Sequence, residues 1–374
     1  MALTADVYIA IDRTKPLSQE PHTGHNRWHP DIPPVATVEP GQVVGLETRD
    51  AFDGQLQPDS GVEDVGRINL DLVHPLIGPI FVNGAEPGDL LEVTIHAIEP
   101  QPFGFTVQAV GFGFLRDLFP QPHIVRWTIA DGAATSEDLP GVRIPGAPFM
   151  GVMGLAPSHE LLERINSRET ALAGRGGMVL LPETAGAIPA DSGLAGRAMR
   201  TIAPHETGGN VDIKQLTAGT LLRIPVYVPG GLFSVGDAHF AQGDGECCGT
   251  AVEMAATCYC SFTLLKQVAA ERQINDVQFS RSEYFTTPEM AAPRRFFATT
   301  GQCTTRDGQA RAEDASLAAR NALLNMIDHL MAEYGYTRQQ AYAICSVAVD
   351  LKISELVDVP NFVVSAFLPL DIFD

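Results

Sequence analysis

The segment AVEMAATCYCSFTLLK (residues 251–266) decides the fold class, because its apolar and small residues recur at every second position. If the segment is extended, one face carries Val252, Met254, Ala256, Cys258, Cys260, Phe262 and Leu264. A helix of the same length is the competing interpretation, since short apolar runs do not separate the two structures. The preceding glycines and the Thr and aromatic content favour a strand. The segment therefore predicts a strand.

Similar short runs recur along the chain and are separated by turn signals. They predict strands within residues 42–56, 89–100, 220–229 and 361–373, and a further strand in the N-terminal segment 1–16. The turn sequences AEPGD (85–89), VPGG (228–231) and GDG (243–245) lie between or beside these runs. This alternation of runs and turns is typical of a mainly β protein.

Helices are expected mainly at the C-terminal end. Apolar residues at helical spacing predict a helix from about Asp314 to Gly335 and a second helix over 337–350, with a shorter one over 158–172. We therefore predict a mainly β, α+β fold with β-sandwich or jelly-roll-like sheets. Residues 1–310 form the β-rich domain that carries the candidate site. Residues 311–374 form a small α/β subdomain, a helical hairpin plus a C-terminal strand packing on that domain.

Composition excludes several classes of protein. The chain has 374 residues, a net charge of −20 and a pI of about 4.8, so its acidic surface disfavours nucleic-acid binding. No run reaches the roughly 18 apolar residues that a membrane span requires. The N-terminus lacks a basic flank followed by an apolar run, which argues against a signal peptide, and we expect a cytoplasmic protein. The six cysteines lack metal-binding spacing and are expected to be reduced, buried thiols.

The segment FSVGDAHFAQGDGECCGTAVEM (233–254) gathers ligand-type side chains. In an extended chain Asp237 and His239 point the same way, as ligands of one divalent metal ion must. Asp244 and Glu246 repeat the same spacing beside glycines, and Glu253 lies in the same span. The alternative is a glycine-rich turn whose acidic side chains face water.

A second polar cluster lies in GGNVDIKQLTAGT (208–220). On a strand, Asn210, Asp212 and Lys214 would share one face, either as the wall of a polar pocket or as a solvated outer face.

Two further groups are weaker. The segment HNRWHPDIPPVATV (25–38) contains His25, Arg27, Trp28 and His29 and reads equally well as a structural loop. Individually, Asp50, Asp53 and His74 are weak ligand candidates.

Five segments, taken together and in order, resemble the acetamidase/formamidase family. They are NRWHPDIPPVATVEPGQVVGLETRDAFDGQL (26–56), GPIFVNGAEPGDLLEV (78–93), GGNVDIKQLTAGT (208–220), FSVGDAHFAQGDGE (233–246) and VDVPNFVVSAFLPLDIF (357–373). The resemblance runs from about residue 20 to the C-terminus. It implies hydrolysis of small aliphatic amides to a carboxylate and ammonia, a predominantly β architecture, a divalent metal (zinc in some members) and a homo-oligomer. The family stretches G-D-x-H, G-D-G-E and G-G-N-x-D-I-K fall on Asp237 and His239, on Asp244 and Glu246, and on Asn210, Asp212 and Lys214.

This chain departs from the family at positions that bear on the substrate. It reads Asp50-Ala51-Phe52-Asp53-Gly54-Gln55 where formamidases tend to read D-W-T-G-G-Q, and Cys247 and Cys248 follow the G-D-G-E stretch. The changes at 51–53 and the Phe149-Met150 pair would reshape an acyl pocket. A cyclic amide such as a γ-lactam therefore competes with formamide and acetamide as the expected substrate.

The working hypothesis is metal-assisted amide hydrolysis. A zinc ion, with calcium as an optional second ion, would lower the pKa of bound water from ~15.7 toward ~7. The expected roles are metal ligation by Asp212, Asp237 and His239, acid–base catalysis by Glu246, oxyanion binding by Lys214 and Asn210, and substrate contact by His74, Phe149 and Asp244. Two alternatives stay open: covalent catalysis by Lys214 or a cysteine at 247–248, and a non-catalytic β protein that binds a small ligand. The expected partners are a small amide and further copies of the chain.

Overall fold

The strand at the centre of the fold is the one whose pattern decided the fold class. The computed structural model describes residues 3–282 and 295–373, and in it β17 spans Glu253–Leu265. It pairs antiparallel with β7 (Leu90–Gln108) and with β5 (Val43–Thr48). Met254, Cys258 and Cys260 are at most 1% exposed, while the intervening Tyr259 is only half-buried. The strand prediction is confirmed, because residues two apart face the core together only in an extended chain.

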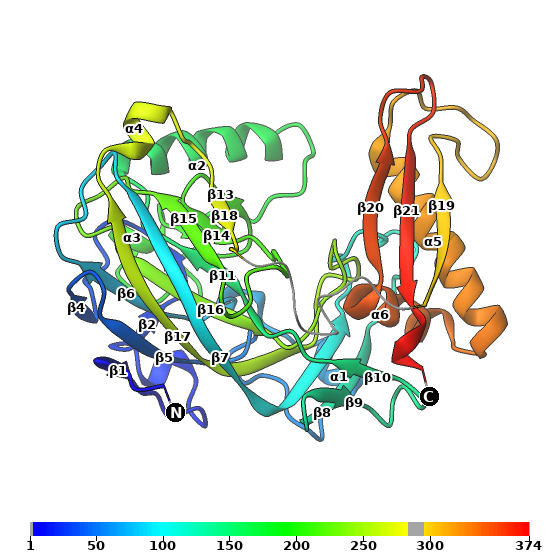
Figure 1. Cartoon of the computed structure of the whole chain (residues 1–374), viewed down its shortest axis with the longest axis horizontal. Helices are drawn as coiled ribbons and strands as arrows, with labels where there is room; N and C mark the ends of the chain where they lie inside the picture. The colour runs from blue at the N-terminus through cyan, green and yellow to red at the C-terminus, as the bar shows by residue number, and fades with distance from the viewer. Residues whose placement is uncertain (1–2, 283–294, 374) are drawn as a thin grey trace.

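Among the described residues, the largest sheet has sixteen strands and extends outward from β17 and β7 (Figure 1). Its other strands are β1 (Val7–Ile9), β2 (Gly24–His25), β4 (Ala36–Val38), β6 (Leu76–Val82), β8 (His123–Ala130), β9 (Ala133–Thr135), β10 (Arg143–Pro145), β11 (Phe149–Gly154), β13 (Pro204–His205), β14 (Gly208–Asn210), β15 (Leu221–Pro225), β16 (Phe233–His239) and β18 (Gln278–Ser280). A separate two-stranded sheet joins β3 (Arg27–Trp28) to β12 (Met199–Arg200). The pairings β16–β11 and β16–β17 are antiparallel and position the candidate site.

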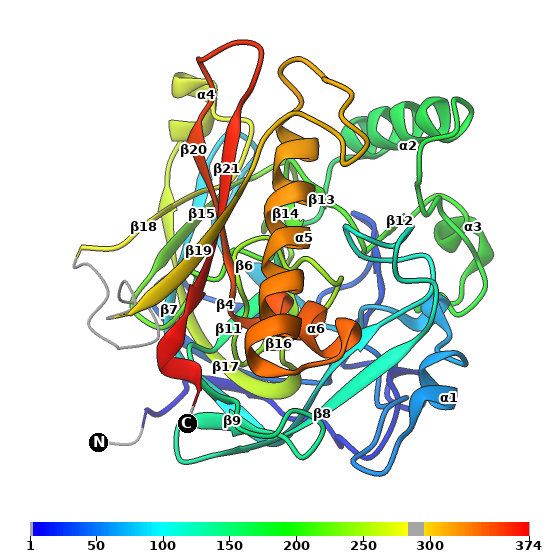
Figure 2. The ribbon, with the colours of Figure 1, turned by 90° about the vertical axis from the view of Figure 1, so that its right-hand side faces the viewer.

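The C-terminal part of the chain forms a third sheet with two helices. Its strand order is β19 (Phe296–Gly301), β21 (Val363–Pro369) and β20 (Asp350–Glu355). This sheet and α5 (Ala315–Tyr334) lie to one side of the large sheet, with α6 (Arg338–Ala348) between them; Figure 2 shows α5 beside the three strands. Because β19 precedes residue 310 and pairs with β21, this sheet draws on both sides of the predicted boundary, which stays a prediction.

Local capping explains where these helices begin and end. Asp314 Oδ1 accepts a hydrogen bond from Leu317 N (2.9 Å) at the start of α5, and Gly335 ends the helix with a φ of 74°. Thr337 and Gln340 form a capping box that begins α6. The two helices expected here are thus confirmed.

The remaining helices are short, except for α2. They are α1 (Val62–Val65), α2 (His159–Ala173), α3 (Ser192–Ala195) and α4 (Val268–Arg272), with 3-10 turns at Leu17–Gln19, Leu70–Leu72 and Leu370–Ile372. The expected fold class, mainly β with antiparallel sheets and a helical C-terminal part, is confirmed. Within 3–282 and 295–373, no helix has the length and apolar character needed to cross a membrane.

Candidate active site

Asp237 and His239 lie together at the end of β16. Both are almost fully buried, at 3% and 1% exposure, and His239 Nε2 is 3.4 Å from Asp237 Oδ1. Asp237 has a φ of 57°, so the strand is locally distorted at this residue. The two side chains nevertheless converge, as their spacing of two predicted.

Asp212 and Glu246 reach the same place from two loops. The strand predicted through Asn210, Asp212 and Lys214 is wrong, because β14 ends at Asn210 and Asp212 has a φ of 47°. The chain therefore leaves the strand after Asn210, and the backbone N–H of Asp212 donates to Gly151 O (3.3 Å). One ligand atom each from Asp212, His239 and Glu246 lies within 4.8 Å of the others.

Glu253 completes the cluster, although no role was predicted for it. It is the first residue of β17, it pairs in register with His239, and it is 1% exposed. Its Oε2 lies 3.1 Å from His239 Nε2, and Asp237, His239 and Glu253 form a second group with ligand atoms within 4.8 Å. The register of the β16–β17 pair would have identified Glu253, since it places these two residues opposite each other.

Gln242 determines which nitrogen of His239 is free. Gln242 Nε2 donates to the carbonyl oxygen of Asp212 (2.9 Å), which turns its Oε1 toward His239 Nδ1 (2.9 Å). Because Oε1 can only accept, Nδ1 carries a proton, and Nε2, which faces Asp237 and Glu253, is the nitrogen left to bind a metal ion in place of a proton. This is the tautomer that a metal ligand requires.

His74 approaches the cluster from a neighbouring segment. Its Nδ1 donates to Thr201 O (3.0 Å), and its Nε2 lies 3.9 Å from Asp237 Oδ2. His74, which was predicted to contact the substrate, therefore lies beside the proposed metal ligands.

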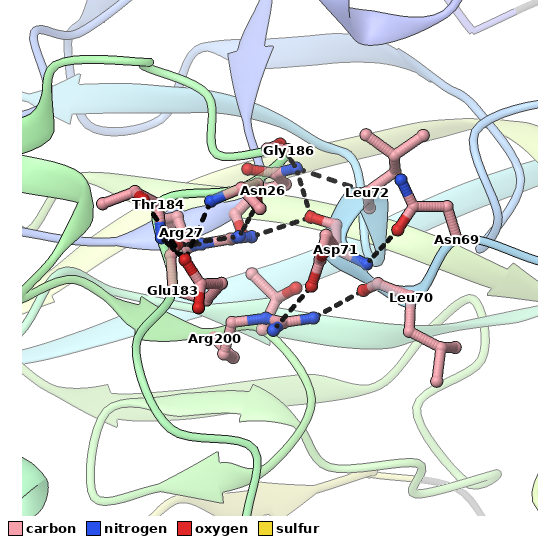
Figure 3. Close-up of polar contacts among 12 residues, drawn as sticks. Asn26, Arg27, Asn69, Leu70, Asp71, Leu72, Glu183, Thr184, Gly186 and Arg200 are labelled. Carbon is pink, nitrogen blue, oxygen red and sulfur yellow. Dashed lines mark hydrogen bonds and ion pairs between the residues drawn. The ribbon is translucent and has the colours of Figure 1, made fainter.

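Two buried arginines hold the segment that leads into His74 (Figure 3). Arg200 contacts Asp71 Oδ1 (3.3 Å) and donates to Leu70 O (2.5 Å). Arg27 donates to Asp71 O (3.2 Å) and to the carbonyl oxygen of Glu183 (3.2 Å). These bonds join segment 69–72 to loop 183–186, so Arg27 has a structural role.

The electrostatics of the site favour a cation. Burial raises the pKa of Glu246 to about 8 and that of Glu253 to about 7. Burial, together with Glu246, also raises the pKa of Asp212. Burial opposes ionisation of Asp237 too, but His74 and His239 hold its pKa well below its usual range. Four carboxyl groups therefore surround His239, and they are not all ionised together because the site lacks enough positive charge to offset their mutual repulsion.

Three buried donor atoms in this cluster make no hydrogen bond, namely Asp212 Oδ1, His239 Nε2 and Glu253 Oε2, although the last two face each other at 3.1 Å. Gly151 opens the space beside them, because a Cβ at this position would lie 2.6 Å from both Asp212 Oδ1 and Asp237 Oδ2. Carboxylate oxygens and an imidazole nitrogen are donors that zinc accepts. The residues therefore fit a divalent metal ion.

Phe149 packs its ring edge-on against His239, with centroids 5.0 Å apart.

Lys214 and Asp244 form a separate group. Lys214 Nζ contacts Asp350 Oδ1, which also accepts from Asp244 N (3.1 Å). Asn210 Nδ2 donates to Ile202 O (3.0 Å), and its Oδ1 is buried without a partner. None of these three belongs to the ligand groups above, so their roles stay predictions.

The cysteines beside Glu246 are unfavourable nucleophiles. Cys247 and Cys248 are 2% and 1% exposed. Burial raises the pKa of Cys248 to about 11 and also raises that of Cys247. Because the thiolate is the reactive form, the structure gives the covalent cysteine alternative no support.

The profile of the Acetamidase/Formamidase family matches residues 10–374. The chain belongs to the acetamidase/formamidase family. It is 36% identical to the formamidase of Methylophilus methylotrophus over 388 residues (98% of this chain, 93% of that one) and 36% identical to the acetamidase of Mycolicibacterium smegmatis over 373 residues (91% and 89%). The solved structure of a gamma lactamase from Delftia acidovorans superposes with a TM-score of 0.92 at 35% identity, covering 98% of this chain and 93% of that one.

Membership of this family confirms two predictions, the resemblance itself and the class of enzyme, an amidohydrolase. The non-catalytic binding protein that the sequence left open is correspondingly disfavoured.

Proposed function

We propose that this family member hydrolyses the C–N bond of small neutral amides, linear or cyclic, at the site around His239, with a divalent metal ion, most simply zinc. The observation that carries the proposal is the set of three buried, unpartnered donor atoms on Asp212, His239 and Glu253. Buried polar atoms without partners are costly, so their clustering points to a bound cation. Asp212, Asp237 and His239 would hold the ion, with Glu253 as a further ligand.

A bound divalent ion would acidify water and polarise the amide carbonyl. Glu246 would take the proton of the attacking water and return it to the departing nitrogen, which must leave as an amine. Burial raises the pKa of this carboxyl to about 8, so it would hold the proton for the second step, while the positive charge of the bound ion would favour the ionised form that the first step requires. Lys214 and Asn210 would donate hydrogen bonds to the oxyanion. Lys214 would use the N–H groups of its ammonium that do not contact Asp350.

The proposed substrates follow from the relatives, which are named formamidase, acetamidase and gamma lactamase. A net charge of −20 favours neutral over anionic amides. A homo-oligomeric, cytoplasmic enzyme remains part of the proposal.

The test is a panel of formamide, acetamide, propionamide and a five-membered lactam, assayed for ammonia release or ring opening. Wild-type protein and His239→Ala are compared with and without a chelator. Turnover that chelation abolishes and added zinc restores supports the proposal. Full turnover by metal-free, folded protein would overturn the metal-dependent part while leaving amide hydrolysis intact.

A further inference from the structure

A second group of metal-ligating side chains lies where the segment after β3 meets the start of α2. His159 Nε2 is 3.1 Å from Asp31 Oδ1, and His29 Nδ1 is 3.8 Å from Asp31 Oδ2. The rings of His29 and His159 meet edge to face, with centroids 5.4 Å apart. One ligand atom from each residue lies within 4.8 Å of the others, and none of the three belongs to the site around His239.

Packing fixes the two segments that carry these side chains. Trp28, next to His29, belongs to one buried apolar cluster with Leu161, Leu162 and Ile165 of α2. The helix is capped beside His159, since Ser158 Oγ accepts from Leu161 N (3.2 Å). The rings are therefore brought together by a packed core rather than by two flexible surface loops.

We propose that His29, Asp31 and His159 form a second binding site for a divalent transition-metal ion of the zinc type. Two imidazoles and one carboxylate are the donor set that such ions select over calcium or magnesium, which prefer oxygen ligands. In tetrahedral zinc sites, ligand atoms at about 2.0–2.2 Å from the metal lie roughly 3.3 Å from one another, so the 3.1 Å separation here already fits and the 3.8 Å separation would shorten by about 0.5 Å.

The imidazole of His29 is in the neutral state, with the lone pair on Nδ1, that metal ligation requires. Asp31 N donates to His29 Nδ1 (3.2 Å), so that nitrogen carries the lone pair, and metal binding would replace this one hydrogen bond. Burial lowers the pKa of His29, which keeps the imidazole neutral. The ring of His29 is 2% exposed, whereas the side chains of Asp31 and His159 are 59% and 62% exposed, so the ion would face solvent.

The alternative is an ordinary surface pair between His159 and Asp31, which stabilises a protein by roughly 0–1 kcal/mol. That alternative needs no ion and does not explain why a second, buried imidazole, that of His29, faces the same carboxylate.

The experiment is equilibrium dialysis of the purified full-length protein against micromolar zinc, followed by elemental analysis. Wild type, His159→Ala and Asp31→Asn are compared with His22→Ala, a matched change at an exposed histidine outside the group. We expect both site variants to bind one zinc equivalent fewer than wild type and His22→Ala, while all four proteins hydrolyse amide at the same rate. When cobalt replaces zinc, the visible absorption of the two site variants should be lower than that of wild type by the amount due to one bound cobalt ion.

Equal zinc content in wild type and both site variants would overturn the second site. Because the comparison is a difference of one equivalent, it holds whether or not the site around His239 binds metal. Failure of the catalytic proposal would appear separately, as amide hydrolysis that persists in metal-free protein.

Discussion

The substitution Gly151→Ala tests the proposed metal site with a single methyl group. Gly151 lies on β11, opposite Asp237, between the paired residues Met150–Ala238 and Val152–Gly236. Its φ is outside the left-handed region, so alanine is compatible with the backbone. The added Cβ would lie 2.6 Å from Asp212 Oδ1 and from Asp237 Oδ2.

The structure sets the size of the effect. Ordinary contacts of a Cβ begin at 3.4 Å, so each carboxylate oxygen must move away by about 0.8 Å. Displacements near 1 Å at a reacting centre cost on the order of 10²-fold in rate. Disturbing the surroundings of a metal ligand typically costs about 10–100-fold in metal affinity. We therefore expect kcat/KM to fall about 100-fold and zinc to be lost to a competing chelator at lower chelator concentration.

Steady-state ammonia release and chelator competition measure the two effects. Gly61→Ala is the matched control, because nothing lies within 4 Å of its added Cβ and its φ is −114°. Gly61→Ala should melt at the wild-type temperature within a few degrees, and Gly151→Ala should melt lower but stay folded, because overpacking a buried site costs about 1–3 kcal/mol. Wild-type turnover and wild-type metal retention in folded Gly151→Ala would refute the placement of the ion beside Asp212 and Asp237.

Three further predictions follow from individual carboxyl groups. Glu246→Gln should lower kcat by about 10²–10⁴-fold while metal content is unchanged, because it removes only the proton carrier; full activity would assign Glu246 to structure. Glu253→Gln should reduce metal content as well as turnover, since its Oε2 is one of the unpartnered donors; a fully metallated variant would remove Glu253 from the ligand set. Burial raises the pKa of Asp53 to about 6, so the folded state binds a proton more tightly than the unfolded state and stability should fall as pH rises from about 4 to 6. Asp53→Asn, which retains an acceptor for Leu17 N, should lose this fall of up to about 3 kcal/mol in urea unfolding; the same pH dependence in both proteins would contradict the assignment.

Local patterns predicted the parts of the fold that short-range forces determine. The alternation over 251–266 identified β17, because burial on one face requires a period of two. Asp314, Gly335 and Thr337 marked the helix ends, because capping depends on neighbouring residues only. Asp237 and His239 were found in the same way, from their spacing within one strand.

Pairing between distant segments and the positions of some backbone turns could not be predicted from local sequence patterns. Glu253 was not assigned because its position opposite His239 depends on the register between two strands. Asp212 was placed on a strand, whereas the chain turns there into the left-handed region, which non-glycine residues seldom adopt. The contact between Lys214 and Asp350 joins residues 136 apart in the chain, so no local pattern signals it.

The most direct test of the metal-dependent site is an anomalous difference map from crystals of active protein, measured across the absorption edge of the metal that X-ray fluorescence detects. We expect a peak bounded by Asp212, Asp237 and His239, within about 2.0–2.2 Å of their donor atoms. A map with no peak there, from crystals whose dissolved protein still hydrolyses amides, would contradict it.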